Sequence, residues 1–179
     1  MYRIRNGQLQ VLLVHPGGPF WAKKDLGAWS IPKGEVEGNE DGLSTAKREF
    51  EEETGLKPAG EMVSLGIVRH KSGKTVSAWG FAGDCDPKAI KSNFFSMEWP
   101  PRSGKQHQFP EIDRADFFTL ESAKEKIIAA EFELLERLAE IQGNTGLPSI
   151  NPTRDVATSE QVPLQKPSSK DKGQGSLFD

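Results

Sequence analysis

Glu49, Glu52 and Glu53 are the residues of this sequence best placed to do chemistry. Their i, i+3 and i+4 spacing puts three carboxylates on one face of a helix, where like charges repel one another. An ordinary run of charges is a solvated face, and that remains the alternative interpretation. No His or Cys lies nearby in the sequence, so the cluster suits a hard cation that prefers oxygen ligands, such as Mg2+ or Mn2+. Such a cation would relieve the repulsion and bridge phosphate oxygens, which predicts metal-dependent chemistry on a phosphorylated compound.

The helix that carries these glutamates has start and stop signals in the sequence. Asn39 or Asp41 can cap its first turn, and Gly55 can end it in the left-handed conformation that glycine tolerates. Apolar residues inside it recur at helical spacing and predict a buried stripe formed by Leu43, Ala46 and Phe50. The carboxylates then lie on a neighbouring face of the same helix.

The glutamates also belong to a longer pattern with fixed spacing. Five residues separate Gly34 from Glu40, and seven more precede the run Arg48 to Leu56, which reads REFEEETGL. This string fills each specified position of the Nudix box, G-x5-E-x7-R-E-U-x-E-E-x-G-U, in which U is a bulky aliphatic or aromatic residue. The chain therefore resembles the Nudix hydrolases over roughly residues 2 to 142. The resemblance implies hydrolysis of a nucleoside diphosphate linked to another group.

The resemblance assigns roles to the box carboxylates. Glu52 and Glu53 would be metal ligands, and Glu49 would be a ligand or the base that orients the attacking water. In several Nudix enzymes that base lies on a distant loop, and Glu111 is the candidate here, with a plain solvated loop acid as the alternative. His107 is expected to be an ordinary loop histidine.

Other box residues are expected to supply geometry. Gly34 follows Pro32-Lys33 in a loop where a backbone carbonyl can approach a metal without interference from a side chain. In proteins similar to this one the box arginine ties the helix to the preceding loop, and Glu40 is the obvious carboxylate partner for Arg48. Glu40, Arg48 and Gly55 are therefore interpreted as structural members of the box, and losing Arg48 would also misplace the catalytic carboxylates.

Signals for the substrate come from basic and aromatic residues. Trp29 and the Pro32-Lys33-Gly34 run look like the W-x-x-P-K-G opening of dinucleoside polyphosphate hydrolases and mRNA-decapping Nudix enzymes, which would make Lys33 a phosphate-facing cation. Trp21 and Trp99 lie in Gly- and Pro-rich loops where a base could stack on them, whereas Trp79, in an alternating strand, is expected in the core. Further candidates for phosphate contacts, each of which could equally be a plain surface charge, are Lys23, Lys24, Arg102 and Lys105.

Composition limits the class of protein. The chain has 179 residues, 35% of them hydrophobic, which fits a single core. A net charge of -3 without a strongly basic stretch argues against general nucleic-acid binding and leaves a small phosphorylated nucleotide as the expected partner. Cys85 is the single cysteine, which excludes an internal disulfide framework and favours a reducing cytoplasm. No apolar run is long enough to span a membrane, and the chain does not open with a signal-like segment.

The pattern along the chain predicts an α/β fold. Two strand-like runs flank the turn signal Asn6-Gly7, and a second hairpin is expected between Met62 to Lys71 and Thr75 to Gly83. Further strands are expected at Ala28 to Ile31 and Phe94 to Trp99, and helices near Glu121 to Ile128 and Glu131 to Ile141. In the last helix Phe132, Leu135, Leu138 and Ala139 share a face. Together with the resemblance this implies the Nudix fold, a mixed β-sheet in an α/β/α sandwich.

The domain is expected to span residues 1–143, followed by a disordered tail over residues 144–179 that is rich in Pro, Ser, Lys and Gly. Family members usually have a further stretch of small and apolar residues before the first hairpin, so we suspect that the amino terminus is truncated. The run Gln174 to Phe178 resembles the short Q-x-x-L-F peptides that dock into bacterial sliding clamps, although an incidental tail segment is the alternative.

The amino-acid sequences of several segments are similar to those of bacterial proteins described as predicted Nudix NTP pyrophosphohydrolases. The shared strings are His15 to Trp21, Ser30 to Glu35 and Glu98 to Gly104. The resemblance favours a hydrolase that cleaves a phosphoanhydride bond in a dinucleoside polyphosphate or a nucleoside triphosphate, oxidised ones included, ahead of ADP-ribose-like compounds. An alternative from another class is a catalytically idle Nudix domain that senses a nucleotide or binds a partner.

Overall fold

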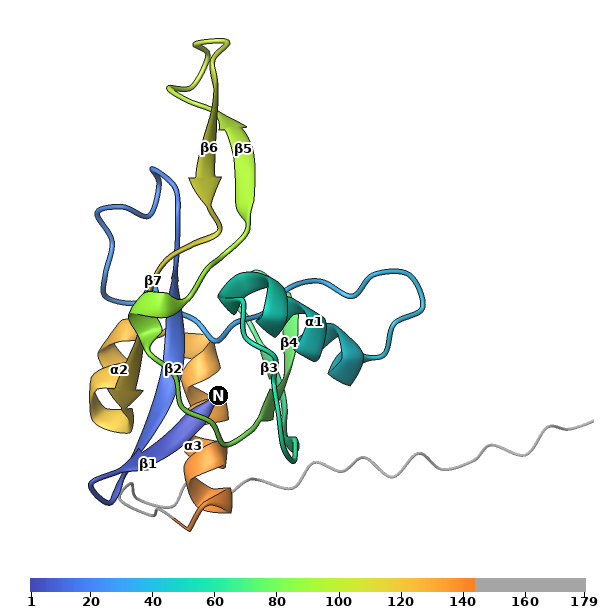
Figure 1. The fold of residues 1–179 in the computed structure, drawn as a ribbon, viewed down its shortest axis with the longest axis vertical. Helices are drawn as coiled ribbons and strands as arrows, with labels where there is room; N and C mark the ends of the chain where they lie inside the picture. Colours follow the sequence, from blue (N-terminus) through green and yellow to red (C-terminus); the bar gives the residue numbers. More distant parts are fainter. Residues whose placement is uncertain (144–179) are drawn as a thin grey trace, which may run out of the picture. The chain divides into compact units, whose positions relative to one another are not determined.

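The computed structural model describes residues 1–143, so the predicted tail and the possible clamp-docking run Gln174 to Phe178 lie outside the described residues. The strands are β1 (Tyr2–Arg5), β2 (Gln8–Pro16), β3 (Val63–Arg69), β4 (Thr75–Gly80), β5 (Phe94–Glu98), β6 (Gln106–Pro110) and β7 (Ile112–Thr119) (Figure 1). The helices are α1 (Gly42–Thr54), α2 (Leu120–Lys126) and α3 (Phe132–Ile141), with short 3-10 turns η1 (Pro87–Ala89) and η2 (Ala129–Glu131). None of the described helices is long and apolar enough to cross a membrane.

Strand β2 is the centre of the first sheet, whose order is β1-β2-β7 with antiparallel neighbours. Its middle residues, Leu12 to His15, are almost completely buried, as expected for a strand with a partner on each side. The predicted hairpin turn is confirmed, because Asn6 and Gly7 both have positive φ, 54° and 73°, as a tight two-residue turn between twisted strands requires.

The β3–β4 hairpin is also confirmed, and its continuation joins the first sheet in parallel. The Tyr2 amide donates to the Phe81 carbonyl (2.9 Å), and the Gly83 amide donates to the Tyr2 carbonyl (2.8 Å). Parallel and antiparallel pairings therefore occur together, as the Nudix resemblance implied for a mixed sheet.

Helices lie on both faces of the β3–β4 hairpin. Successive residues of β4 point to opposite faces. The Trp79 ring packs on the first turn of α1 at Gly42, whereas the next residue, Gly80, approaches Leu138 of α3. All four residues predicted for the inner face of α3 are buried: Phe132, Leu135, Leu138 and Ala139. The prediction of an α/β sandwich is thus confirmed.

The segment Ala28 to Ile31, predicted as a strand, makes only isolated bridges instead. Ser30 pairs with Val14, and Trp29 pairs in parallel with Ile127 at the end of α2. The Trp29 amide donates to the Lys126 carbonyl (3.0 Å), and the Ile128 amide donates to the Trp29 carbonyl (2.8 Å). These hydrogen bonds hold the segment against the connection between α2 and α3. The loop that follows the segment then contacts α1, where the Lys33 amide donates to Glu53.

Strands β5 and β6 pair only with each other among the described strands and project as an arm from the top of the domain (Figure 1). The sequence predicted β5 but not β6 or β7. Strand β6 is short and mostly polar, with an exposed Gln106-His107-Gln108 run, so it lacks the alternation that signals a half-buried strand.

Candidate active site

Helix α1 places the glutamate cluster. The Asp41 side chain caps the helix by accepting hydrogen bonds from the amides of Leu43 and Ser44, both at 3.0 Å. Gly55 ends it with φ 72°, and its amide donates to the Glu51 carbonyl (2.7 Å). Phe50 is buried, while the other two stripe residues, Leu43 and Ala46, are half-buried. The predicted helix is confirmed, with Asp41 as its cap.

The Arg48 guanidinium connects the carboxylates of the box. Its Nη2 donates to Glu40 Oε2 (3.1 Å) and to the Glu35 carbonyl (3.0 Å), which ties α1 to the preceding loop. Its Nη1 lies 2.8 Å from Glu49 Oε1 and 3.2 Å from Glu52 Oε2. The hydrogen bonds from Arg48 hold the pKa of Glu40 below its ordinary value. The single positive charge of Arg48 is therefore shared among the carboxylates of Glu40, Glu49 and Glu52.

Glu53 contacts the loop before α1 and, unlike Glu49 and Glu52, makes no hydrogen bond to Arg48. Its Oε2 accepts a hydrogen bond from the Lys33 amide (2.9 Å). Burial raises the pKa of Glu53 to about 7, the negative charges of Glu49 and Glu111 add to the rise, and the contacts with Lys33 oppose it. A cation bound beside Glu53 would stabilise the charged form of this partly buried carboxylate and lower its pKa.

Glu111 reaches this neighbourhood from the junction between β6 and β7. Its backbone is fixed on both sides, because its amide donates to the Asn93 carbonyl (2.9 Å) and its carbonyl accepts from the Gly17 amide (2.8 Å). A Cβ on Gly17 would lie 2.0 Å from the Pro110 carbonyl oxygen, so this close backbone approach requires glycine. The Glu111 side chain is exposed and makes no hydrogen bond or ion pair within residues 1–143.

Gly34 packs directly against Glu49. A Cβ built on Gly34 would lie 1.9 Å from Glu49 Cδ and 2.0 Å from Glu49 Oε2, which no side chain could tolerate without moving the carboxylate. Any side chain at position 34 would therefore displace the Glu49 carboxylate from the position in which Arg48 holds it.

The donor chemistry fits a divalent cation, although the side chains are not gathered around one point. Among residues 1–143 there is no group of three or more His, Cys, Asp or Glu arranged to hold a metal ion. Glu49 and Glu52 turn toward the shared Arg48 Nη1, and Glu53 turns toward the Lys33 amide. These three carboxylates are hard oxygen donors, and a nearby cation would favour the charged form of Glu53, whose pKa is raised chiefly by burial. A bound cation would therefore have to compete with Arg48 for two of its ligands.

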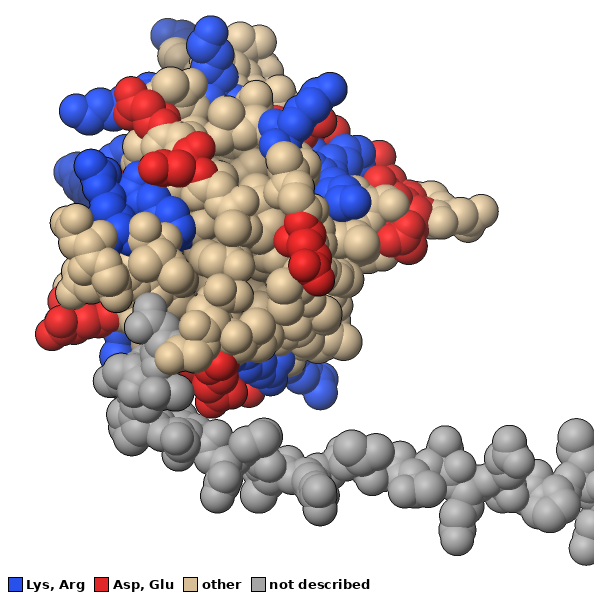
Figure 2. Space-filling model, turned by 60° about the horizontal axis from the view of Figure 1, so that its bottom comes forward, with Lys and Arg blue, Asp and Glu red and all other residues tan. Residues whose placement is uncertain are grey.

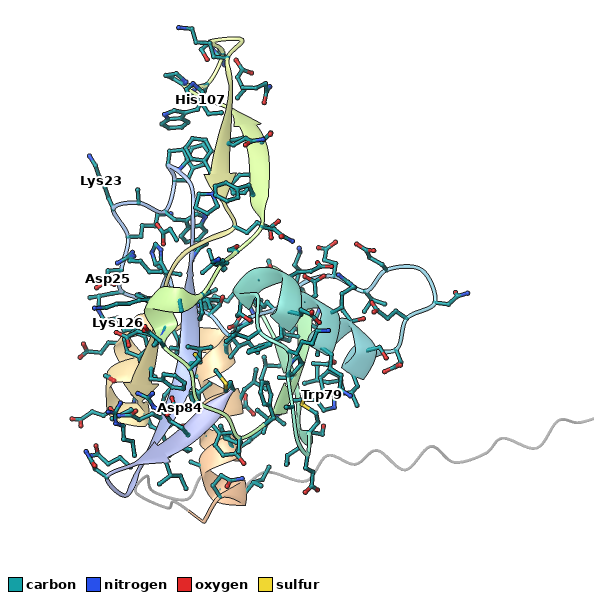
Figure 3. All side chains as sticks on the ribbon, in the orientation of Figure 1. Lys23, Asp25, Trp79, Asp84, His107 and Lys126 are labelled. Atoms are coloured by element: carbon teal, nitrogen blue, oxygen red, sulfur yellow. The ribbon has the colours of Figure 1, made fainter. Side chains whose placement is uncertain are left out.

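A cavity of about 750 Å3 opens beside α1 and extends between the β3–β4 hairpin and α3. Most of its wall is apolar, and the apolar lining includes Leu12, Phe50, Leu65, Trp79, Phe81, Leu135 and Leu138. Lys33, Gly34 and His70 supply part of its polar lining. Trp79 was expected in the core, but it is half-buried and lines this cavity, because Gly42 leaves room for the indole against α1. Figure 3 shows this tryptophan on β4 beside α1.

Three residues predicted to bind substrate do not line this cavity. Trp99 directly follows the arm strand β5 and packs edge-on against Phe20, with ring centroids 5.4 Å apart. Trp21 lies in the loop after β2, where the Lys24 ammonium is 4.3 Å from its ring centroid. Arg102 is exposed between the two arm strands with φ 65°. The structure therefore groups Lys33 with the carboxylates and leaves these three residues at the arm and the adjoining loop.

The remaining predicted residues have local roles. Trp29 is buried, and its indole donates to Asp25 Oδ1 (2.9 Å), while Asp25 also pairs with Lys126. Figure 3 shows Asp25 and Lys126 together on the left of the domain, and Lys23 and His107 on the loop and the arm. The four further cationic candidates are exposed: Lys23, Lys24, Arg102 and Lys105.

Sequence reasoning missed two residues beside the cavity, His70 and Glu131. Glu131 is completely buried, and its Oε2 accepts from the Ile31 amide (3.1 Å). A signal was present, because Glu131 lies on the same helical stripe as Leu135 and Leu138, where a carboxylate is out of place unless it has a partner.

Comparison with known proteins agrees with the fold. The model of the NUDIX domain family matches residues 1–138. A C. elegans Ap4A hydrolase binary complex is similar with 20% identity and a TM-score of 0.56, covering 80% of this chain and 94% of that one. The NUDIX domain of Shewanella oneidensis NrtR, complexed with ADP ribose, shows 19% identity, a TM-score of 0.54, and coverage of 79% and 82%. A search of curated proteins gives no match. At these identities the two structures establish the fold alone.

Proposed function

Because the chain belongs to the Nudix family of pyrophosphohydrolases, we propose that it is a metal-dependent hydrolase of nucleoside diphosphate derivatives. Its substrate in this proposal is a dinucleoside polyphosphate or a nucleoside triphosphate, oxidised ones included. The observation that carries the proposal is the position of Glu49, Glu52 and Glu53 on one helix that borders an apolar cavity. Lys33 lines that cavity and contacts Glu53 through its amide.

The cavity suits a nucleoside. A volume of about 750 Å3 lies within the range of pockets that bury small ligands, and an apolar wall with an aromatic ring favours a nucleobase. Lys33 then faces the phosphate chain as it leaves the cavity toward α1. On the face displayed in Figure 2, acidic and basic side chains are interspersed, unlike the continuous basic stripe that tracks a nucleic-acid backbone. This favours a small nucleotide as the partner.

Glu49, Glu52, Glu53 and the Gly34 carbonyl would hold the divalent cation. When bound, that cation supplies positive charge that stabilises the phosphoryl oxygens as the bond breaks. Arg48 keeps Glu49 and Glu52 in place and shares their charge. Glu111 accepts a proton from the attacking water, since its carboxylate is exposed and has no partner among the described side chains, whereas Glu49 is engaged by Arg48. Water attacks phosphorus, the anhydride bond breaks, and the leaving phosphate departs.

The test is a panel of nucleoside triphosphates, oxidised deoxynucleoside triphosphates, dinucleoside polyphosphates, ADP-ribose and nucleotide sugars, each with Mg2+ or Mn2+. We expect turnover of at least one of the first three groups, and greatly reduced turnover by Glu53→Gln prepared in parallel. If the wild-type protein hydrolyses none of the panel, the proposal fails. A single free cysteine, Cys85, fits a cytoplasmic location, which fractionation of cells that express the protein would test.

A second candidate is a Nudix domain that binds a nucleotide without cleaving it. The observation that favours it is the engagement of Glu49 and Glu52 by Arg48, which already supplies the cation that they need. Calorimetric binding of a panel nucleotide with unchanged ligand recovered after long incubation with either metal would support this candidate over the hydrolase.

A further inference from the structure

Glu131, at the start of α3, is a buried carboxylate that lies next to residues of the cavity wall but does not line the cavity itself. Glu131 is 0% exposed, and only one of its oxygens is satisfied, by the Ile31 amide at 3.1 Å. Within residues 1–143, Glu131 Oε1 and His70 Nε2 are the buried side-chain polar atoms that lack a hydrogen-bond partner. Unsatisfied buried polar atoms are rare in folded proteins and call for an explanation.

Two basic side chains converge on the free oxygen. Lys33 Nζ lies 3.5 Å and His70 Nε2 lies 3.3 Å from Glu131 Oε1. Their side chains are 32% and 18% exposed, and both line the cavity, whereas Glu131 does not. Because His70 Nε2 is buried, the exposed edge of the ring is the edge away from Glu131. Glu131 can therefore influence a ligand in the cavity only by positioning the side chains of Lys33 and His70.

The same carboxylate fixes the loop that enters the box. Glu131 accepts the Ile31 amide, and Glu53 accepts the Lys33 amide two residues later, so α3 and α1 hold alternate amides of one segment. The Lys33 amide thus donates to Glu53 of α1, and the Lys33 ammonium lies beside Glu131 at the start of α3. Its position is set by both helices.

We propose that Lys33 and His70 form an anion subsite that binds a phosphate group of the substrate, and that Glu131 is the positioning residue of this subsite. The proposal rests on the proposed function for the identity of the substrate. An ammonium and an imidazole N–H are both donors to phosphate oxygens, and an imidazole with hydrogens on both nitrogens can face Glu131 with Nε2 and the anion with Nδ1. Lys33 and His70 both line the cavity, so each can present a donor to a ligand there.

The first experiment uses inorganic tripolyphosphate, without metal and with EDTA, on the full chain labelled with 15N-histidine. The chain has three histidines, so His15 and His107 serve as internal references, with His70→Asn assigning the signal. We expect tripolyphosphate to shift the His70 ring signals in the wild-type protein, and to shift them much less in Glu131→Gln. An unchanged His70 signal in the wild-type protein would overturn the proposal, whatever the result of the hydrolysis panel.

The second experiment measures kinetics on whichever panel compound the wild-type protein cleaves. His70→Asn and Glu131→Gln should each raise KM roughly tenfold with a smaller change in kcat, as expected for lost charge-assisted contacts to phosphate. Glutamine at 131 keeps an oxygen for the Ile31 amide, so melting should change little. The matched controls are His107→Asn on the arm and Glu133→Gln on the exposed face of α3, both with wild-type KM.

The two experiments separate the two proposals. A His70 response to tripolyphosphate without hydrolysis of any compound rejects the proposed function and keeps the subsite. Hydrolysis with wild-type KM in both variants rejects the subsite and keeps the proposed function. Equal losses in the variants and in the two controls would reject a specific role for Glu131 and His70.

Discussion

At Glu52 and Glu53 the proposed chemistry depends on charge. Replacing either residue by glutamine keeps its size and, at position 53, an oxygen for the Lys33 amide at 2.9 Å. A neutral amide is a much poorer ligand for a hard cation, so we expect turnover to fall by about two orders of magnitude or more. Steady-state rates with saturating Mg2+, beside melting curves that match the wild type, provide the measurement. Near-normal rates in both variants would remove these residues from the metal site.

At Gly34 the constraint is space. A Cβ would lie 1.9 Å from Glu49 Cδ, so Gly34→Ala must displace either the loop or the carboxylate. We expect turnover to fall by roughly a hundredfold, because misplacement near reacting groups by about an ångström has such effects. Glu37→Ala is the control, since it changes an exposed side chain of the same loop. Similar losses in both variants would show that the loop tolerates no alanine, for reasons unrelated to Glu49.

Arg48 combines a structural and an electrostatic role. Arg48→Ala leaves Glu40, Glu49 and Glu52 without their shared cation, and we expect a melting temperature lower by several degrees together with reduced turnover. Because the pKa of Glu40 is held below its ordinary 4.5, this stabilisation is present above that value and is lost as the pH falls through the folded-state pKa. The melting difference between the two proteins should therefore shrink in acid. Lys47→Ala, on an exposed neighbour, should melt like the wild type at each pH.

At the scale of elements, the junction between β6 and β7 brings Glu111 to α1 from far along the chain. Backbone hydrogen bonds to Asn93 and Gly17 hold this junction whatever the Glu111 side chain is. Glu111→Gln should therefore leave melting unchanged and lower kcat by about a hundredfold, the lower range for loss of a general base. Glu61→Gln, an exposed loop residue, is the control. An unaltered kcat would return the base role to Glu49.

The elements that the sequence predicted best are those with local signals. Helix α1 has a cap at Asp41, a stop at Gly55 and an apolar stripe, and the Asn6-Gly7 turn fixes the first hairpin. Strand β6 lacks a local signal because it is short and mostly polar, whereas β7 pairs with β2, which lies far away in the sequence. The Ala28 to Ile31 segment has strand-like residues but pairs with the connection after α2, which no local pattern specifies.

The site follows the same division. The box residues share one helix and one loop, so their spacing alone predicts that they meet. The grouping of Lys33, His70 and Glu131 joins the loop before α1, the end of β3 and the start of α3, and only the folded chain brings these together. Trp21 and Trp99 have suitable residue types for stacking a base, but the arm and its neighbouring loop carry them away from the cavity.

At the scale of the whole molecule, the chain extends beyond the described domain. Residues 144–179 contain one adjacent pair of large apolar residues, Leu177 and Phe178, within the run Gln174 to Phe178. An apolar pair in an otherwise polar segment is a candidate anchor for a hydrophobic pocket on a partner. The run resembles clamp-binding peptides but has glycine at its second position, where leucine is usual. Weaker binding than that of a peptide with leucine there is therefore expected.

The peptide from Lys172 to Asp179 carries the whole motif and can be tested without the enzyme. We expect a fluorescent form of it to bind the sliding clamp of the same organism, and a Leu177→Ala, Phe178→Ala form to bind at least about tenfold more weakly, as for anchor residues at an interface. Equal, weak binding by both peptides would eliminate clamp docking and leave the hydrolase proposal untouched. Selective binding would bring the enzyme close to DNA synthesis, where hydrolysis of damaged deoxynucleoside triphosphates would act before their incorporation.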